Sequence, residues 1–132
     1  MSQENVEVVH AFLEAFNRGD ADAALGLLTD DVDLRPPSHL LDGVVFRGHA
    51  GFRAWVKRTE ESWRKAEGSA RELATVGEHL VLAVDYRLIG HGSGAPVNQS
   101  NISVWTLREG KIAAVISYPG EQEAFEAVGL SE

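Results

Sequence analysis

The side chains best suited to binding or catalysis lie on a stretch whose polar and apolar residues alternate as in a β-strand. Asn101, Ser103 and Trp105 share one face, and Ile102 and Val104 share the other. Amide and hydroxyl groups beside an indole ring are typical of a ligand pocket with a polar end and an apolar end. The alternative is a solvated polar face, which leaves the indole in water and forfeits part of the few kcal/mol that its burial supplies. We favour the inward arrangement.

The inward arrangement places Ile102 and Val104 on the outer face of the sheet, with Ile116 of the last strand as a companion. An exposed apolar patch of this kind invites a second subunit. We therefore expect a homodimer that forms through this face.

Asp85 and Arg87 lie two residues apart on a second strand, so they share a face. They form either a buried acid/base couple or a cross-strand salt bridge on the outside. The residues between and beside them, Tyr86 among them, are better core material, which favours the salt bridge and points Tyr86 toward the cavity. Asp85 stays a weak catalytic candidate.

The five histidines show no spacing typical of a metal site, and His39 is the one placed to overhang a cavity mouth, in the loop after Pro37. It could titrate near neutral pH. The acidic cluster of Asp30, Asp31 and Asp33 lacks the glycine and distal glutamate of an EF-hand, so we interpret it as a solvated helix end. We expect neither a metal nor a cofactor.

Elements that position these groups follow from the spacing of apolar residues. Helices are expected first and strands later, which is the pattern of an α+β domain with helices on one face of a sheet. Gly19 ends the first helix and Asp20 caps the next. No repeat or linker divides residues 1–132, so we expect a single domain. The helices are expected over 6–17, 21–29, 49–66 and 121–129, and the strands near 33–35, 73–76, 79–90, 97–107 and 111–118.

Composition excludes several classes of function. The net charge of −8 with scattered Lys and Arg argues against nucleic acid and against an anionic membrane as partners. The N-terminus is acidic and polar rather than signal-like, and no apolar run approaches the length of a membrane span. The absence of cysteine excludes thiol chemistry and fits a cytoplasmic location.

The segments "FLEAFNRGDADAALGLLTDDV", "FRGHAGFRAW", "VWTLREGKIAAVISYP" and "EAFEAVGL" together resemble the SnoaL-like group of the nuclear-transport-factor-2-like superfamily. This superfamily also contains ketosteroid isomerases, polyketide cyclases and limonene epoxide hydrolase. The resemblance implies a strongly curved antiparallel sheet wrapped around the N-terminal helices, cone-shaped with an internal cavity. It also implies that the convex face of the sheet forms the dimer contact.

The catalytic residues of these relatives mostly do not carry over. Phe12 stands where ketosteroid isomerases place an oxyanion-binding tyrosine, and a phenyl ring donates no hydrogen bond. Residues 35–37 read Arg-Pro-Pro where the proton-shuttling aspartate would stand, and the second oxyanion acid would fall near Ser103. Residues 118–120 supply no acid of the kind that SnoaL-type cyclases use.

Two functions from different classes follow, and a structural dimer with a vestigial cavity is a third, plainer possibility. The first is a protein that binds a small hydrophobic molecule in an internal cavity without a catalytic acid/base pair. The second is an isomerase, cyclase or hydrolase acting on a small polycyclic ketone, lactone or epoxide. In that case Arg35, His39, Asn101 and Ser103 would orient and polarise an oxygen, and His39 would be the only near-neutral base. The residues leave open whether the protein is an enzyme. The expected pocket residues are Phe12, Phe16, Arg35, His39, Trp55, Tyr86, Asn101, Ser103 and Trp105.

Overall fold

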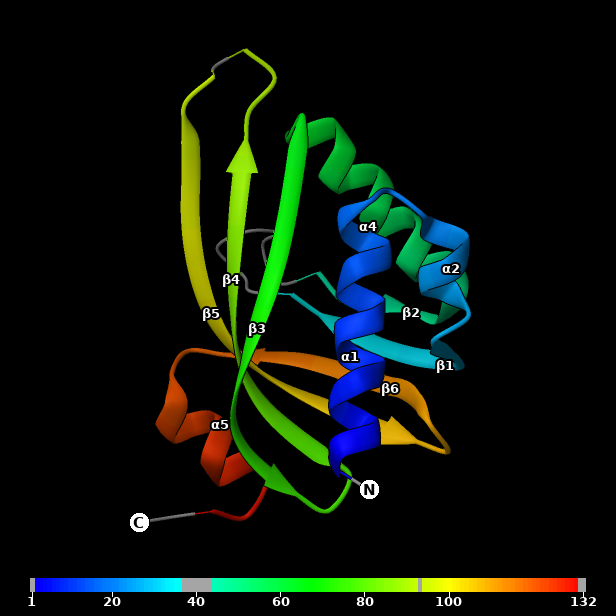
Figure 1. Cartoon of the computed structure of the whole chain (residues 1–132), viewed down its shortest axis with the longest axis vertical. Helices are drawn as coiled ribbons and strands as arrows, with labels where there is room; N and C mark the ends of the chain where they lie inside the picture. The colour runs from blue at the N-terminus through cyan, green and yellow to red at the C-terminus, as the bar shows by residue number, and fades with distance from the viewer. Residues whose placement is uncertain (1, 37–43, 93, 131–132) are drawn as a thin grey trace.

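The fold combines helices with one six-stranded sheet. A computed structural model describes residues 2–36, 44–92 and 94–130. The α+β class expected from the sequence is confirmed (Figure 1). The elements of the described part are α1 (Ser2–Asn17), α2 (Ala21–Leu25), β1 (Leu28–Arg35), β2 (Phe46–Arg47), α4 (Gly48–Ser62), β3 (Lys65–Val76), β4 (His79–Ile89), β5 (Pro96–Arg108), β6 (Lys111–Tyr118) and α5 (Glu121–Ala127).

The sheet is mixed rather than wholly antiparallel. Its strand order is β2-β1-β6-β5-β4-β3, and β1 runs parallel to β6 while the other neighbours are antiparallel. The expected antiparallel sheet is therefore wrong at this one junction. A parallel pair needs a long crossover, and the chain from α4 to β5 supplies it between β1 and β6.

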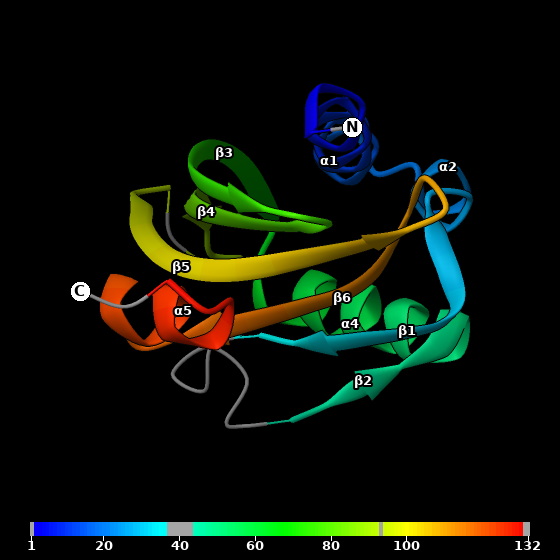
Figure 2. The same cartoon turned by 90° about the horizontal axis from the view of Figure 1, so that it is seen from below.

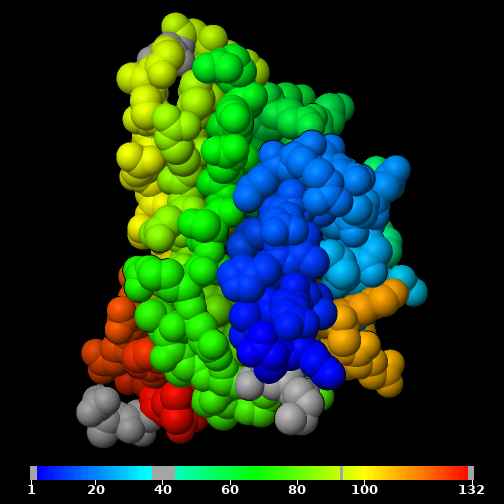
Figure 3. Space-filling model, in the orientation of Figure 1, coloured from blue at the N-terminus to red at the C-terminus, as the bar shows by residue number. Residues whose placement is uncertain are grey.

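The helices divide between the two faces of the sheet. Helix α1 packs against β3, and α4 packs against β1, so both lie on the concave face (Figures 1 and 2). On the face drawn in Figure 3, α1 lies directly against β3. The main core forms on this concave side, where Phe12, Phe52 and Trp105 are each at most 2% exposed.

Helix α5 covers part of the convex face. Val104 is 5% exposed and packs with Val81 and Ala124 of α5, and Ile102 is partly buried against the same cluster. The expectation that Val104 forms an exposed outer patch is therefore wrong, because the chain's own last helix covers it. Ile116 remains partly exposed.

Helix α1 ends and helix α2 begins as the sequence predicts. Gly19 adopts a positive φ of 77°, and the Asp20 side chain accepts a hydrogen bond from the Ala23 amide. Helix α2 is shorter than expected, because it ends at Leu25 and β1 begins at Leu28.

Candidate functional site

A cavity of about 280 Å³ lies between the concave face of the sheet and helices α1 and α4. Among the described residues its wall contains six aromatic side chains and a small set of polar ones. The lining is Phe12, Leu13, Phe16, Leu34, Arg35, Pro36, Trp55, Thr59, Ser62, Trp63, Ala66, Tyr86, Leu88, Gln99, Ser103, Trp105, Val115 and Ser117.

Aromatic contacts fix the apolar wall. Phe16 of α1 stacks on Trp55 of α4 with ring centroids 5.5 Å apart and an interplanar angle of 14°. Phe12 meets Trp105 of β5 edge to face at 5.8 Å. Such pairs add to the stability gained from burial alone, so the wall is held by contacts that do not depend on a ligand.

Strand β5 turns Gln99, Asn101 and Ser103 toward the concave face. Ser103, Gln99 and Trp105 line the cavity, and Asn101 shares their face because it lies opposite the buried Val84. Asn101 itself is not part of the lining. The arrangement of this strand is therefore the inward one.

Trp105 and Ser103 form a buried hydrogen bond, in which the indole Nε1 donates to the serine Oγ over 2.9 Å. Ser103 lies directly opposite Ser117 on β6. Because its oxygen accepts from the indole, the Ser103 hydroxyl proton is left to donate, and it has no acceptor within the described part of the chain.

Two amide oxygens on this strand are buried without a hydrogen bond, Oε1 of Gln99 and Oδ1 of Asn101. A buried acceptor left unpaired costs about 1–3 kcal/mol. Gln99 lines the cavity and lies directly opposite Tyr86 on β4. Both side chains thus belong to the wall of the same cavity.

Tyr86 is held as a neutral hydrogen-bond donor, because burial raises its pKa to about 12. Its hydroxyl has no partner among residues 2–36, 44–92 and 94–130. The ring lies over Gly68 of β3, where a Cβ would come within 3.2 Å of the Tyr86 Cε1 atom. Gly68 is fixed in turn by Asn17, which donates to its carbonyl over 2.9 Å and accepts from its amide over 2.8 Å.

Arg35 lines the cavity, but its charge is already paired. Its Nε and Nη2 atoms donate to the two oxygens of Asp33 over 3.1 and 3.0 Å. The hydrogen bond to Asp33 raises the pKa of Arg35 above its ordinary value. Arg35 pairs in register with Ile116, which places this ion pair on the convex side of the strand end.

The other two catalytic candidates are not brought into the described cavity wall. Asp85 lies on the convex face, where its carboxylate accepts from the Ser100 hydroxyl and sits 3.9 Å from Arg71. The salt bridge is thus formed with Arg71 of β3 rather than with Arg87. His39 falls outside the described residues.

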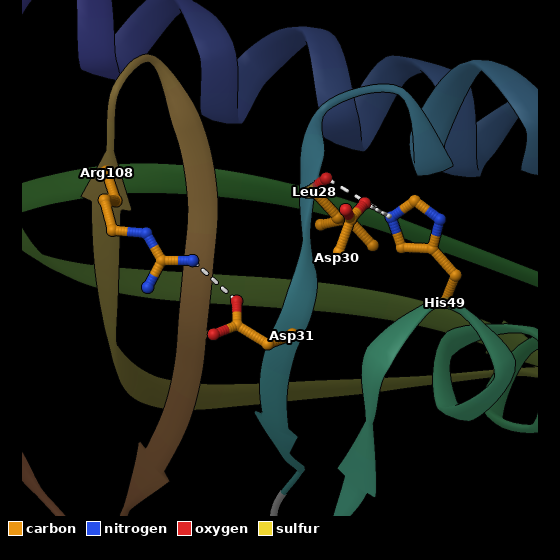
Figure 4. A network of polar contacts seen from close by, with 5 residues as sticks. All are labelled: Leu28, Asp30, Asp31, His49 and Arg108. Carbon is orange, nitrogen blue, oxygen red and sulfur yellow. Dashed lines mark hydrogen bonds and ion pairs between the residues drawn. The ribbon is translucent and has the colours of Figure 1, made fainter.

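The acidic cluster lies on strand β1 and not at a helix end, which corrects the expectation (Figure 4). Arg108 donates to Asp31 over 2.6 Å and lowers the pKa of that carboxyl below its usual range. His49 approaches the Leu28 carbonyl at 3.3 Å and Asp30 at 3.9 Å. These contacts join β1 to the start of α4 and to the end of β5.

Residues 9–115 match the SnoaL-like domain. The chain belongs to the SnoaL-like domain family. The resemblance seen in the sequence is thereby confirmed. No curated protein sequence gives a significant match.

Solved structures similar to this SnoaL-like domain share its fold. TerC co-crystallised with polyporic acid has a TM-score of 0.77 at 20% identity, covering 95% of this chain and 97% of that one. A polyketide cyclase, so assigned provisionally, from Xanthomonas campestris pv. campestris has a TM-score of 0.75 at 24% identity, covering 97% and 96%. A ketosteroid isomerase-like protein from Catenulispora acidiphila in complex with trimethylamine has a TM-score of 0.74 at 18% identity, covering 94% and 93%.

The described lining of this SnoaL-like domain contains no aspartate, glutamate or histidine. Within the same residues no three His, Cys, Asp or Glu side chains gather to hold a metal ion. None of the described helices is long and apolar enough to cross a membrane. The groups available for chemistry in the described wall are therefore hydroxyls, indole N–H groups and one amide, because the guanidinium of Arg35 is paired with Asp33 on the convex side.

A second cavity of about 260 Å³ lies beside the first, between the end of α1, helices α2 and α4, and the start of β3. The two share Phe16, Thr59, Trp63 and Ala66 in their walls. Phe16, which stacks on Trp55, therefore lies at the boundary between the two cavities.

Sequence reasoning missed several lining residues of this SnoaL-like domain. Gln99 shares its parity with Asn101 and Ser103, so the alternation of β5 could have found it. Ser117 and Val115 depend on the register of β6 against β5, for which the sequence holds no local signal. Trp63, which directly follows the last residue of α4, lines both cavities.

Proposed function

We propose that this SnoaL-like domain binds a small, largely apolar, ring-containing molecule in the cavity beneath the sheet. The observation that carries the proposal is the aromatic wall of Phe12, Phe16, Trp55 and Trp105 facing a short run of polar groups on one strand. Sites for small molecules are typically of this kind, mostly apolar with a few placed polar groups.

The volume of the cavity supports a ligand of modest size. An apolar cavity of about 150 Å³ holds a benzene ring. The space here is about 280 Å³. A molecule of two fused rings with one polar substituent is therefore an appropriate class to test first.

The charge of the wall favours binding over catalysis. An isomerase, cyclase or hydrolase needs a group that takes a proton near neutral pH. The described wall offers no carboxylate or imidazole, and the pKa of Tyr86 at about 12 makes it a donor rather than a base. The paired guanidinium of Arg35 also cannot accept a proton.

Thermal unfolding with a panel of compounds tests the proposal. The panel holds substituted naphthalenes, polycyclic ketones, lactones and terpene epoxides, and the variant is Ala66→Phe, which adds a ring inside the cavity wall. Ligand bound to the native state alone raises stability by about 2.7 kcal/mol at one hundred times the Kd. We expect at least one class to raise the Tm of the parent and to lose that effect in Ala66→Phe.

The matched control is Ser69→Phe, which adds the same ring to the same strand at an exposed position opposite Asp85. It should keep the ligand-dependent shift. If no class raises the Tm of the parent, or if Ala66→Phe keeps the shift, the cavity is not the binding site and the proposal is wrong.

A further inference from the structure

We infer that the cavity selects ring compounds that carry a hydroxyl group, held between Gln99 and Tyr86, over compounds that carry only a carbonyl. This inference rests on the proposed function and specifies its ligand class. The residues that carry it lie opposite each other on β5 and β4 and both line the cavity.

The first step concerns the acceptor. Oε1 of Gln99 is buried and makes no hydrogen bond in the described part of the protein. Buried polar groups in folded proteins almost always have a partner, and an unpaired one beside a cavity calls for an explanation. A ligand that donates a hydrogen bond supplies the missing partner, whereas a ketone or an ether oxygen leaves the amide oxygen unpaired.

The second step concerns the donor. The Tyr86 hydroxyl stays protonated at neutral pH and has no partner within residues 2–36, 44–92 and 94–130. Its ring cannot lean toward β3, because Gly68 already lies against it and is fixed by Asn17. The cavity wall therefore contains one donor and one buried acceptor, on residues that lie opposite each other on β4 and β5.

A hydroxyl group is the smallest group that can form a hydrogen bond with both the Gln99 oxygen and the Tyr86 hydroxyl. Its O–H donates to the Gln99 oxygen, and its own oxygen accepts from Tyr86. A carbonyl satisfies Tyr86 alone and leaves the Gln99 acceptor unpaired. A group without donor or acceptor satisfies neither. The ranking of ligands that differ only in this substituent is thus set by the two side chains.

Isothermal titration calorimetry with three matched compounds tests the ranking. The probes are 1-naphthol, 1-tetralone and 1-fluoronaphthalene, which share a bicyclic frame and differ in the polar atom. We expect the parent to bind 1-naphthol about tenfold more tightly than 1-fluoronaphthalene, a factor that corresponds to about 1.4 kcal/mol. We expect 1-tetralone to fall between them.

Variants of the two side chains separate their roles. Gln99→Met keeps the length of the side chain and removes the amide, so it should weaken 1-naphthol about tenfold and leave 1-tetralone unchanged. Gln99→Glu keeps an acceptor and should retain the preference for 1-naphthol. Tyr86→Phe should weaken both oxygen-bearing probes. Asn98→Leu changes an exposed amide on the same strand and should alter none of the affinities.

The possible failures are distinguishable. If the parent binds all three probes equally, the proposed function stands and the inference is wrong. If 1-tetralone binds more tightly than 1-naphthol, Gln99 donates through its Nε2 atom and the inference is again wrong. If none of the probes binds, the inference and the bicyclic ligand class of the proposed function both fail, and the wider panel then decides the proposed function.

Discussion

Polar side chains on the concave and convex faces of the sheet differ in their hydrogen bonding within the protein. On the convex face polar groups contact one another: Asp85 accepts from Ser100, His79 contacts Thr106 at 2.8 Å, and Arg35 binds Asp33 through two atoms. On the concave face the oxygens of Gln99 and Asn101 are buried without partners. Since both faces belong to the same strands, the difference does not arise from the backbone.

This contrast separates polar groups that stabilise the fold from those available to a ligand. A polar side chain paired within the protein has already lost its water and gained a partner. A buried oxygen without a partner has lost the water alone, which costs stability unless a ligand restores the bond. Proteins accept such costs at functional sites more often than elsewhere. The concave face of β5 carries two such oxygens, those of Gln99 and Asn101.

The largest expected effect comes from removing an apolar side chain on the concave face and comparing it with the same change on the convex face. Trp105→Ala on the concave face should lower the free energy of unfolding by about 3–5 kcal/mol, because it removes a ring that is 2% exposed and in contact with Phe12. Ile102→Ala on the convex face removes a partly buried side chain and should cost about 1–2 kcal/mol. Urea unfolding followed by circular dichroism measures both.

An equal loss of unfolding free energy in the two variants would contradict this difference between the faces. It would mean that the convex face is more deeply buried in solution than within a single chain. The homodimer expected through this face from the sequence would then be the first explanation to test, by sedimentation of the parent and of Ile102→Ala.

The second prediction uses the pKa of Tyr86, which burial raises from 10.0 to about 12. Between pH 10 and 12 the tyrosine of the unfolded chain loses its proton while the folded protein keeps it. The contribution of Tyr86 to stability is therefore constant below pH 10 and falls as the pH rises through this window, by about 2–3 kcal/mol in all. Tyr86→Phe should lack this decline when unfolding is measured across the window.

The other tyrosine supplies the control. Tyr118 lies on the convex side of β6, opposite Ile102, and Tyr118→Phe should keep the alkaline decline of the parent. If Tyr118→Phe removes the decline and Tyr86→Phe does not, Tyr86 is hydrated in solution and the description of the concave face is wrong at that residue.

The sequence predicts elements whose own residues determine them. Apolar spacing predicts α1 and α4, and alternation predicts β5. The continuous apolar run 80–84, which is buried on both faces, predicts β4. Strand β3 was expected only near 73–76, yet it begins at Lys65. Residues 65–72 contain few β-branched or aromatic side chains, so pairing with β4 rather than local propensity makes them a strand.

The candidate site shows the same division between features that local sequence determines and features that depend on pairing between strands. Strand alternation places Ser103 and Trp105 beside the cavity, and Gln99 follows from the same parity. The pairing of Gln99 with Tyr86 depends on the register between two strands, which single-strand patterns do not contain. The position of Arg35 was expected, but its bond to Asp33 depends on both side chains leaning to one side of the strand end.

The smallest expected effect tests the concave face most directly. Asn101→Leu replaces a buried, unpaired amide oxygen with an apolar group of similar size, so it should raise the free energy of unfolding by about 1 kcal/mol. Asn98→Leu, at an exposed position three residues earlier, should change it by less than about 0.5 kcal/mol. Thermal and urea unfolding of the two variants beside the parent measure the difference. A loss of stability in Asn101→Leu would show that its oxygen is hydrogen-bonded in the folded protein, and the contrast between the two faces would then rest on Gln99 alone.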